Sequence, residues 1–285
     1  MQLKYKEHVF FLNTLSVKDE IKLINTTNEQ DKNYVKPPTC SLSLSEIKNK
    51  ENDLEFIDLN YEQSNENSFY LCLMLLSAQP FTSFVENIAE SSSKIPPLIT
   101  NFYKIITAIK NKKTISIENL IPFENCDNFV EGYRFILSVI HEQLLSHYYF
   151  KEDSWIVPSK QKTIKPIFPA SSPITNMFHG KLVRDVGEVK SGYFDVLRAK
   201  NPTLLNIFKS KDLLNRPSVV LIETDHLFKE VPSGYMISAV LAGVDSYVLY
   251  IFSSKKWFKY TREGMTVQES IGEISNIKYV LLSNK

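Results

Sequence analysis

Glycine and cysteine are scarce in this sequence, and each shortage excludes a class of site. The 285 residues contain eight glycines, and no Gly-rich phosphate-binding loop can be found among them. The three cysteines, Cys40, Cys72 and Cys126, lie far apart and never form a Cys-x-x-Cys pair, which excludes a zinc ribbon or finger built from local cysteine pairs. No cluster of His, Cys, Asp and Glu has metal-ligand spacing, so we expect neither a metal nor a cofactor.

An excess of charge of one sign and a long hydrophobic run are also missing. Lys and Arg number 33 against 32 Asp and Glu, which gives a formal net charge of +1. This balance gives no global reason to expect direct nucleic-acid binding, so we expect proteins as partners. No stretch approaches the length of a transmembrane helix, and the first apolar cluster, residues 9–12, is too short for a signal peptide. We therefore expect an intracellular protein with reduced thiols.

The sequence does contain a distinctive central stretch at residues 59–86. A polar start leads into an unbroken apolar run, residues 69–76, and the stretch ends at Pro80-Phe81. Because this run is apolar on every side, it predicts a helix that is buried all round, with a buried strand as the alternative. Leu, Met, Tyr and Cys outnumber β-branched residues here, which favours the helix, and Asn67 or Ser68 could cap it. The N-terminus of such a helix suits a nucleophile, because its free N–H groups and dipole stabilise an anion.

The remaining pattern predicts an α+β fold with a helical part followed by a sheet. Residues 1–53 are expected to form an N-terminal extension and flexible linker, since 26–53 is strongly polar. A mostly helical lobe is expected over about 67–149, with helices at 95–110 and after an N-cap at Asp127. Residues 151–176 are expected to form a loop. The antiparallel sheet lobe, about 174–285, should contain strands at 178–189, 193–197, 219–223, 235–241, 247–252, 257–260 and 279–282.

Several landmarks fall in an order typical of one protease family. They are residues 59–86, the segment Phe178-His179-Gly180-Lys181-Leu182, residues 216–222, and closing hairpins at 235–240, 246–251, 257–260 and 279–282. In this order the chain resembles the catalytic domain of the ubiquitin-specific proteases over roughly residues 54–285. The resemblance implies the papain-like fold of that family, with a helical thumb lobe followed by an antiparallel palm and fingers.

The chain departs from the family at the residues that would carry the chemistry. Active members have Asn-x-Cys-Tyr at the start of the central helix, Gly-His-Tyr before a late strand, and an Asn or Asp after Trp-aromatic-x-aromatic. A Cys/His/Asn-or-Asp triad needs a thiolate, a base that forms it and a group that orients the base. In the best ungapped register the Cys position is Glu66, or Phe69 after a shift of three residues. The His position is Ser246 and the orienting position is Thr261.

The oxyanion-stabilising Asn is also replaced, by Tyr61, with Asn60 one residue away. The resemblance therefore implies an inactive pseudo-deubiquitinase. One branch shares this pattern, namely the inactive spliceosomal members that promote tri-snRNP assembly and pre-mRNA splicing. Its box ends in Asn and an acidic residue, like Asn65-Glu66, and its Ser-Tyr matches Ser246-Tyr247. That branch normally carries an N-terminal zinc-finger module, which the first 55 residues here, with one cysteine, cannot form.

Membership of this branch implies a nuclear, non-catalytic scaffold whose partners are proteins of a large RNA–protein assembly, with ubiquitin binding left open. The pseudo-protease scaffold subunit of the poly(A)-nuclease deadenylation complex is another inactive relative of the family. The small basic cluster Lys110-Asn111-Lys112-Lys113 could contact RNA phosphates, although a solvated turn is the default interpretation.

A displaced triad that uses Cys72 is the main catalytic alternative. His141, His147 or His226 would then be the base, with Asp225 beside His226. Neighbouring residues on a strand point to opposite faces, so Asp225 and His226 cannot simply orient each other. Cys72 lies inside an all-apolar run, where the pKa of a thiol rises, so we expect it to fill the core. A lone carboxylate such as Glu66 is more often a helix-start residue favoured by the dipole than a general acid or base.

Overall fold

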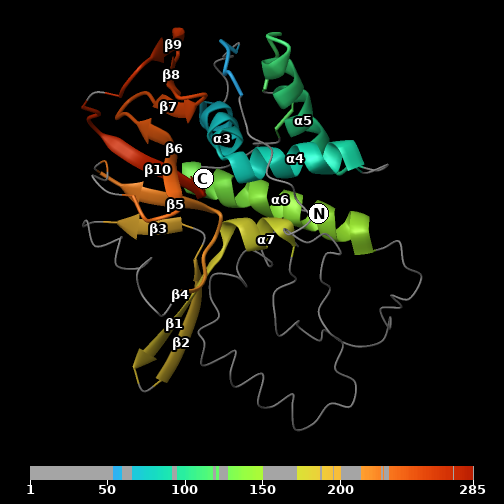
Figure 1. The fold of residues 1–285 in the computed structure, drawn as a ribbon, viewed down its shortest axis with the longest axis vertical. Helices are drawn as coiled ribbons and strands as arrows, with labels where there is room; N and C mark the ends of the chain where they lie inside the picture. The colour runs from blue at the N-terminus through green and yellow to red at the C-terminus, as the bar shows by residue number, and fades with distance from the viewer. Residues whose placement is uncertain are drawn as a thin grey trace.

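The computed structural model describes residues 54–59, 66–91, 95–117, 120–121, 128–149, 172–186, 188–194, 196–199, 213–225, 227, 231–271 and 273–284. The predicted extension and linker at residues 1–53 therefore lie outside the described part of the chain. The helices are α3 (Glu66–Ser77), α4 (Gln79–Ser91), α5 (Pro97–Lys110), α6 (Phe129–Tyr149) and α7 (Pro173–Phe178). Figure 1 shows these helices on one side of the larger sheet, so that the described chain forms a helical layer packed against a β layer.

Helix α3 is buried all round, as the central apolar run predicts. Residues 68–76 have at most 5% of their surface exposed, and they include the polar side chain of Ser68 and the thiol of Cys72. The predicted cap is wrong, because the helix already begins at Glu66 and Asn67 and Ser68 lie within its first turn. Over the described residues no single helix has the length and apolar composition to cross a membrane, although α3 and residues 79–90 of α4 together reach that length and composition across an 87° bend.

Local capping chemistry explains where two further helices begin. The backbone N–H of Glu131 donates to the side-chain oxygen of Asn128 at 2.9 Å, so Asn128 caps α6. Asp127, the predicted cap, lies outside the described residues. Helix α7 occupies positions where the sequence pattern predicted a loop and then a strand from 178, and that prediction is wrong. The segment is helical because Pro173 stands in its first turn and Ser172 and Thr175 form a capping box.

The strands form two sheets, a small one of three strands and a larger one of seven. The small sheet has the order β2-β1-β4, and the larger sheet has the order β3-β5-β10-β6-β7-β8-β9. All neighbours are antiparallel except β3 and β5, which are parallel, so the larger sheet is mixed. Figure 1 shows β1 and β2 extending away from the helices as a ribbon. The strands are β1 (Gly180–Val186), β2 (Glu188–Phe194), β3 (Val196–Ala199), β4 (Leu213–Asn215), β5 (Val219–Thr224), β6 (Tyr235–Ala242), β7 (Val248–Ser253), β8 (Lys256–Thr261), β9 (Gly264–Gln268) and β10 (Ile277–Asn284).

The main core lies between the helices and one face of the seven-stranded sheet. Alternate residues of β7, Leu249 and Ile251, join α3 in this core, whereas Val240 of β6 and Val280 of β10 belong to a second apolar cluster. Because successive side chains of a strand point to opposite faces, the sheet separates these two clusters. The site described below therefore lies where the inner face of the sheet meets the start of α3.

The extended segment 54–59 is fastened to the same end of the sheet. The Ser253 hydroxyl donates to the carbonyl of Leu54 at 2.7 Å, and the Tyr260 hydroxyl donates to the carbonyl of Ile57 at 2.6 Å. The ring of Phe56 packs against Phe258 with centroids 5.8 Å apart. Segment 54–59 therefore holds β7 and β8 in place beside α3.

We expect α3 to dominate the stability of the fold. Replacing Leu73, which is fully buried, with Ala should lower the free energy of unfolding by about 2–5 kcal/mol, because it leaves a cavity in the core. The matched control is Val244→Ala, since Val244 is 67% exposed and should change stability by less than about 0.5 kcal/mol. Urea unfolding followed by circular dichroism measures both. Equal effects of the two substitutions would contradict the central position of α3.

Candidate functional site

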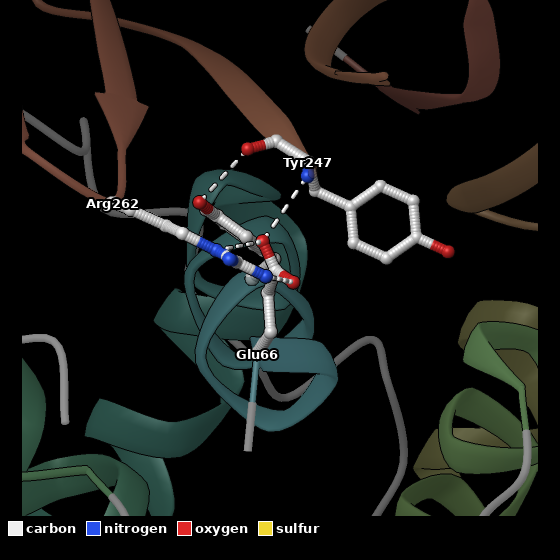
Figure 2. A network of polar contacts seen from close by, with 4 residues as sticks. Glu66, Tyr247 and Arg262 are labelled. Carbon is white, nitrogen blue, oxygen red and sulfur yellow. Dashed lines mark hydrogen bonds and ion pairs between the residues drawn. The ribbon is translucent and has the colours of Figure 1, made fainter. Parts of the chain in front are cut away.

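The carboxylate of Glu66 lies at the N-terminus of α3 and is held by two segments of the sheet. One of its oxygens accepts a hydrogen bond from the backbone N–H of Tyr247 at 3.1 Å. The other pairs with the terminal guanidinium nitrogen of Arg262 at 2.8 Å, and the Nε of Arg262 lies 3.4 Å from the first oxygen. Figure 2 shows the Arg262 side chain reaching to Glu66 while the backbone of Tyr247 approaches from the sheet. Glu66 thus joins the start of α3 to two loops of the sheet.

Tyr247 is bound to α3 through both of its backbone groups. Its N–H donates to Glu66, and its carbonyl accepts a hydrogen bond from the Tyr70 hydroxyl at 3.0 Å. Glu66 and Tyr70 are four residues apart, so they lie on the same face of the helix. The rings of Tyr70 and Tyr247 also meet edge to face at 6.2 Å. Burial, and secondly the nearby charge of Glu66, raises the pKa of the Tyr247 hydroxyl.

Gly243 shapes the loop between β6 and β7 that presents this N–H. It has a φ of +132°, and a Cβ there would lie 2.0 Å from the carbonyl oxygen of Ser246. Only glycine fits such a close approach of the backbone. Its N–H donates to the carbonyl of Asn276 at 2.9 Å, which fixes the loop against the start of β10. The loop is therefore shaped so that Tyr247 faces α3.

Arg262 lies in the two-residue turn between β8 and β9. The turn is closed by the pair Thr261 and Gly264, and the Thr261 hydroxyl accepts a hydrogen bond from the N–H of Glu263 at 3.2 Å. The Arg262 side chain is 55% exposed, whereas the Glu66 side chain is 18% exposed. The ion pair therefore lies at the rim of the core, where solvent screening limits its contribution to stability.

The structure places the predicted site residues in segments that meet at Glu66. Ser246 is exposed in the β6–β7 loop and directly precedes Tyr247, and Thr261 is the last residue of β8 and directly precedes Arg262. Phe69, the position in the shifted register, is 5% exposed and packs against Tyr260 with ring centroids 6.1 Å apart. Tyr61 and Asn60 lie outside the described residues.

The contacts of the Glu66 carboxylate indicate a structural role for this side chain. An ionised carboxylate that accepts charge-assisted hydrogen bonds from a guanidinium is strongly oriented, and at a helix N-terminus it also benefits from the macrodipole by about 0.3–1 kcal/mol. These contacts occupy both oxygens of Glu66. Sequence reasoning missed Arg262 and the N–H of Tyr247. The sequence offered one signal, the positive charge of the residue directly after Thr261. Its relation to Glu66 is evident only once the structure places the β8–β9 turn beside α3.

The other described candidate groups are either buried in the core or in contact with a polar or charged partner. Cys72 is fully buried, and burial raises the pKa of its thiol far above the usual range. The Nδ1 of His141 lies 2.7 Å from the hydroxyl of Ser172. In the basic cluster, Lys110 pairs with Glu86, and Lys112 pairs with Glu55 at 3.2 Å. His226 and the side chain of His147 lie outside the described part, within which no group of His, Cys, Asp and Glu could hold a metal ion.

Comparisons with known proteins identify the fold. No family model matches the chain, and no curated protein matches it by sequence. An essential yeast splicing factor shares its fold with a TM-score of 0.53 and 12% identity, over 87% of this chain and 73% of the other. The protein has the ubiquitin-specific-protease fold. This confirms the α+β fold that the sequence pattern predicted and the family fold that the order of landmarks implied.

Two further solved structures have the same fold. A chain of the SAGA DUB module bound to monoubiquitin aligns with a TM-score of 0.54 and 12% identity, over 92% of this chain and 74% of that chain. The PAN2 pseudoubiquitin-hydrolase of Saccharomyces cerevisiae aligns with a TM-score of 0.52 and 12% identity, over 88% of this chain and 92% of that one. The similar structures thus include both a module with bound ubiquitin and a pseudo-hydrolase, so the fold by itself does not decide catalysis.

We expect a measurable coupling between Glu66 and Arg262. In a double-mutant cycle with Glu66→Gln and Arg262→Gln, the interaction free energy should be about 0.5–1 kcal/mol and should fall as salt is raised, because the Arg262 side chain is exposed. The control cycle uses Glu55→Gln and Lys112→Gln, whose side chains are 56% and 70% exposed and should couple less. No difference between the two cycles would contradict the proposed fastening of α3 through Glu66.

Proposed function

We propose that the protein is a non-catalytic scaffold built on a degenerate ubiquitin-specific-protease domain. The observation that carries this proposal is the engagement of Glu66 by Arg262 and by the N–H of Tyr247. In the register of the resemblance, Glu66 stands where active members carry the nucleophilic Cys. A carboxylate that is already paired with a guanidinium cannot act as the thiolate does in attacking an isopeptide carbonyl. The supporting argument is therefore that a structural contact has replaced a reactive group.

The two remaining triad positions also lack the required chemistry. Ser246 would stand in the place of the His base, and Thr261 in the place of the Asn or Asp that orients it. A neutral hydroxyl is a poor general base at neutral pH, because efficient proton transfer needs a group whose pKa lies near that pH. Tyr61 would likewise stand in the place of the Asn that stabilises the oxyanion in active members. Their joint replacement supports a domain that acts through its shape and its binding surfaces.

We further propose that the scaffold works in the nucleus as a component of pre-mRNA splicing. This rests on the match of Asn65-Glu66 and Ser246-Tyr247 to the inactive spliceosomal branch, and it agrees with the presence of a splicing factor among the similar structures. The alternative is a pseudo-protease scaffold of another RNA-processing complex, which the likeness to the PAN2 pseudoubiquitin-hydrolase favours.

We expect the purified protein to be inert toward ubiquitin substrates. Neither cleavage of a fluorogenic ubiquitin substrate nor labelling by a ubiquitin probe with a thiol-reactive C-terminus should exceed the background, because Cys72 is buried and Glu66 is not a thiol. An active ubiquitin-specific protease is the positive control. Turnover or labelling that disappears in Cys72→Ala would instead establish a displaced triad and overturn the proposal.

Affinity purification from cells of its own organism tests the cellular role. We expect subunits of the splicing machinery to be enriched over a control purification, because the domain would act by docking within that assembly. Enrichment of deadenylase subunits would assign the scaffold to the alternative complex. Enrichment of ubiquitin conjugates alone would contradict the splicing role and leave a plain ubiquitin-binding module.

A further inference from the structure

Strand β9 forms a free edge of the seven-stranded sheet. It is last in the strand order, and within the described residues it pairs only with β8. The closing pair of a two-residue hairpin is hydrogen-bonded, and such pairs alternate along an antiparallel ladder. Gly264, Thr266 and Gln268 therefore bond to β8, while the N–H and C=O groups of Met265 and Val267 point away from the sheet.

The residues of β9 themselves carry few of the features by which proteins usually protect a free edge, although the carboxylate of Asp58 lies near the start of the strand, 3.3 Å from where a Cβ of Gly264 would stand. The five residues of β9, Gly-Met-Thr-Val-Gln, include no charge and no proline, and the pairing with β8 contains no bulge. Val267 is 54% exposed and is one of only two large exposed apolar residues in the described chain. Glu263 and Glu269 lie just beyond the two ends of the strand. The same edge therefore presents an exposed apolar side chain, Val267, together with the unpaired backbone groups of Met265 and Val267.

The neighbouring strand adds positive charge and aromatic surface on the outer face of the sheet. Lys259 lies directly opposite Thr266 of β9, and its ammonium group is 5.9 Å from the ring centre of Tyr250. Trp257 lies opposite Gln268 and packs against Phe252 with centroids 5.0 Å apart. No ion pair within the described residues engages Lys259. The charge of this face therefore suits an acidic partner.

Strand spacing places this cation within reach of an added strand. Neighbouring strands lie about 4.8 Å apart, so a strand added to β9 would lie about 10 Å from β8. A lysine side chain and a glutamate side chain on the same face can bridge that distance together. On the opposite face, a side chain of the added strand would lie beside Val267. The edge therefore distinguishes the two faces of an incoming segment.

We propose that the β9 edge binds an extended segment of a partner protein by strand addition, with an acidic side chain toward Lys259 and an apolar side chain beside Val267. The unpaired backbone groups of Met265 and Val267 supply the hydrogen bonds, and the two faces supply selectivity. Glu263 and Glu269 disfavour acidic residues at the ends of the segment. The inference goes beyond the proposed scaffold role and does not require the Glu66 site to be inert.

A synthetic peptide tests this surface on the full-length protein. The probe is Thr-Val-Glu-Val-Glu-Val-Thr, which carries its charge at the centre and alternates faces in either strand direction. We expect saturable binding with a Kd below about 1 mM by fluorescence anisotropy. The same peptide with N-methylated backbone amides should not bind, because it cannot complete the ladder. Equal binding of the methylated peptide, or no binding of the unmodified one, would overturn the proposal.

Two variants of Val267 separate the contribution of its backbone N–H to peptide binding from the contribution of its side chain. Val267→Pro removes an outward N–H while leaving the bonds to β8 intact, and it should abolish binding. Val267→Thr keeps the N–H and the β-branched shape, and it should retain most of the binding. Circular dichroism confirms that both variants fold. If Val267→Pro is folded and binds as well as the wild type, the edge is not the docking site.

A charge swap tests the selectivity of the outer face. Lys259→Glu should weaken binding of the Glu peptide by up to about fivefold and strengthen binding of a matched Lys peptide by a similar factor. The control Lys113→Glu makes the same charge change at an exposed residue next to α5 and should alter neither. Equal effects of both substitutions would overturn the role of Lys259. A concentration-dependent dimer that Val267→Pro removes would assign the edge to a second copy of this chain instead.

Discussion

The structure depends on the complete burial of α3 between the other helices and the sheet. Nine successive residues of this helix are almost fully covered, and the helix packs against α4, α6, β6 and β7. A helix with apolar side chains on every side cannot lie at a surface, because each exposed face would lose the free energy of burial. The sheet and the surrounding helices are therefore arranged so that α3 has no exposed side.

Such a helix creates an electrostatic requirement at its N-terminus. The first N–H groups have no partner within the helix, and the dipole favours a negative charge there. In this protein the carboxylate of Glu66 supplies a negative charge at this point, and it binds Arg262 and the N–H of Tyr247 from two loops of the sheet. The same electrostatics that would lower the pKa of a thiol at this point stabilise a carboxylate. The contacts of Glu66 thus join the start of the helix to the sheet.

Local patterns in the sequence predicted the elements whose signals are strong and regular. The apolar run at 69–76, the helical spacing before Lys110 and the alternating strands near the C-terminus all appear in the structure. Helix α7 was missed because a loop-rich composition obscured the capping box of Ser172 and Thr175. Strand β9 was missed because five residues with only one β-branched pair, Thr266 and Val267, give little alternation. Short elements of this kind depend on the neighbours against which they pack.

The sequence by itself determined the fold class, the buried central helix and the residue types at Glu66, Ser246 and Thr261. These follow from hydrophobic patterning and from the identity of side chains, which do not depend on distant parts of the chain. Only the tertiary structure decided which groups meet at Glu66 and which strand ends the sheet. Tyr247 and Arg262 lie 181 and 196 residues from Glu66, and contacts over such separations depend on how the sheet is ordered. That order is set by the packing of whole elements, which local patterns do not encode.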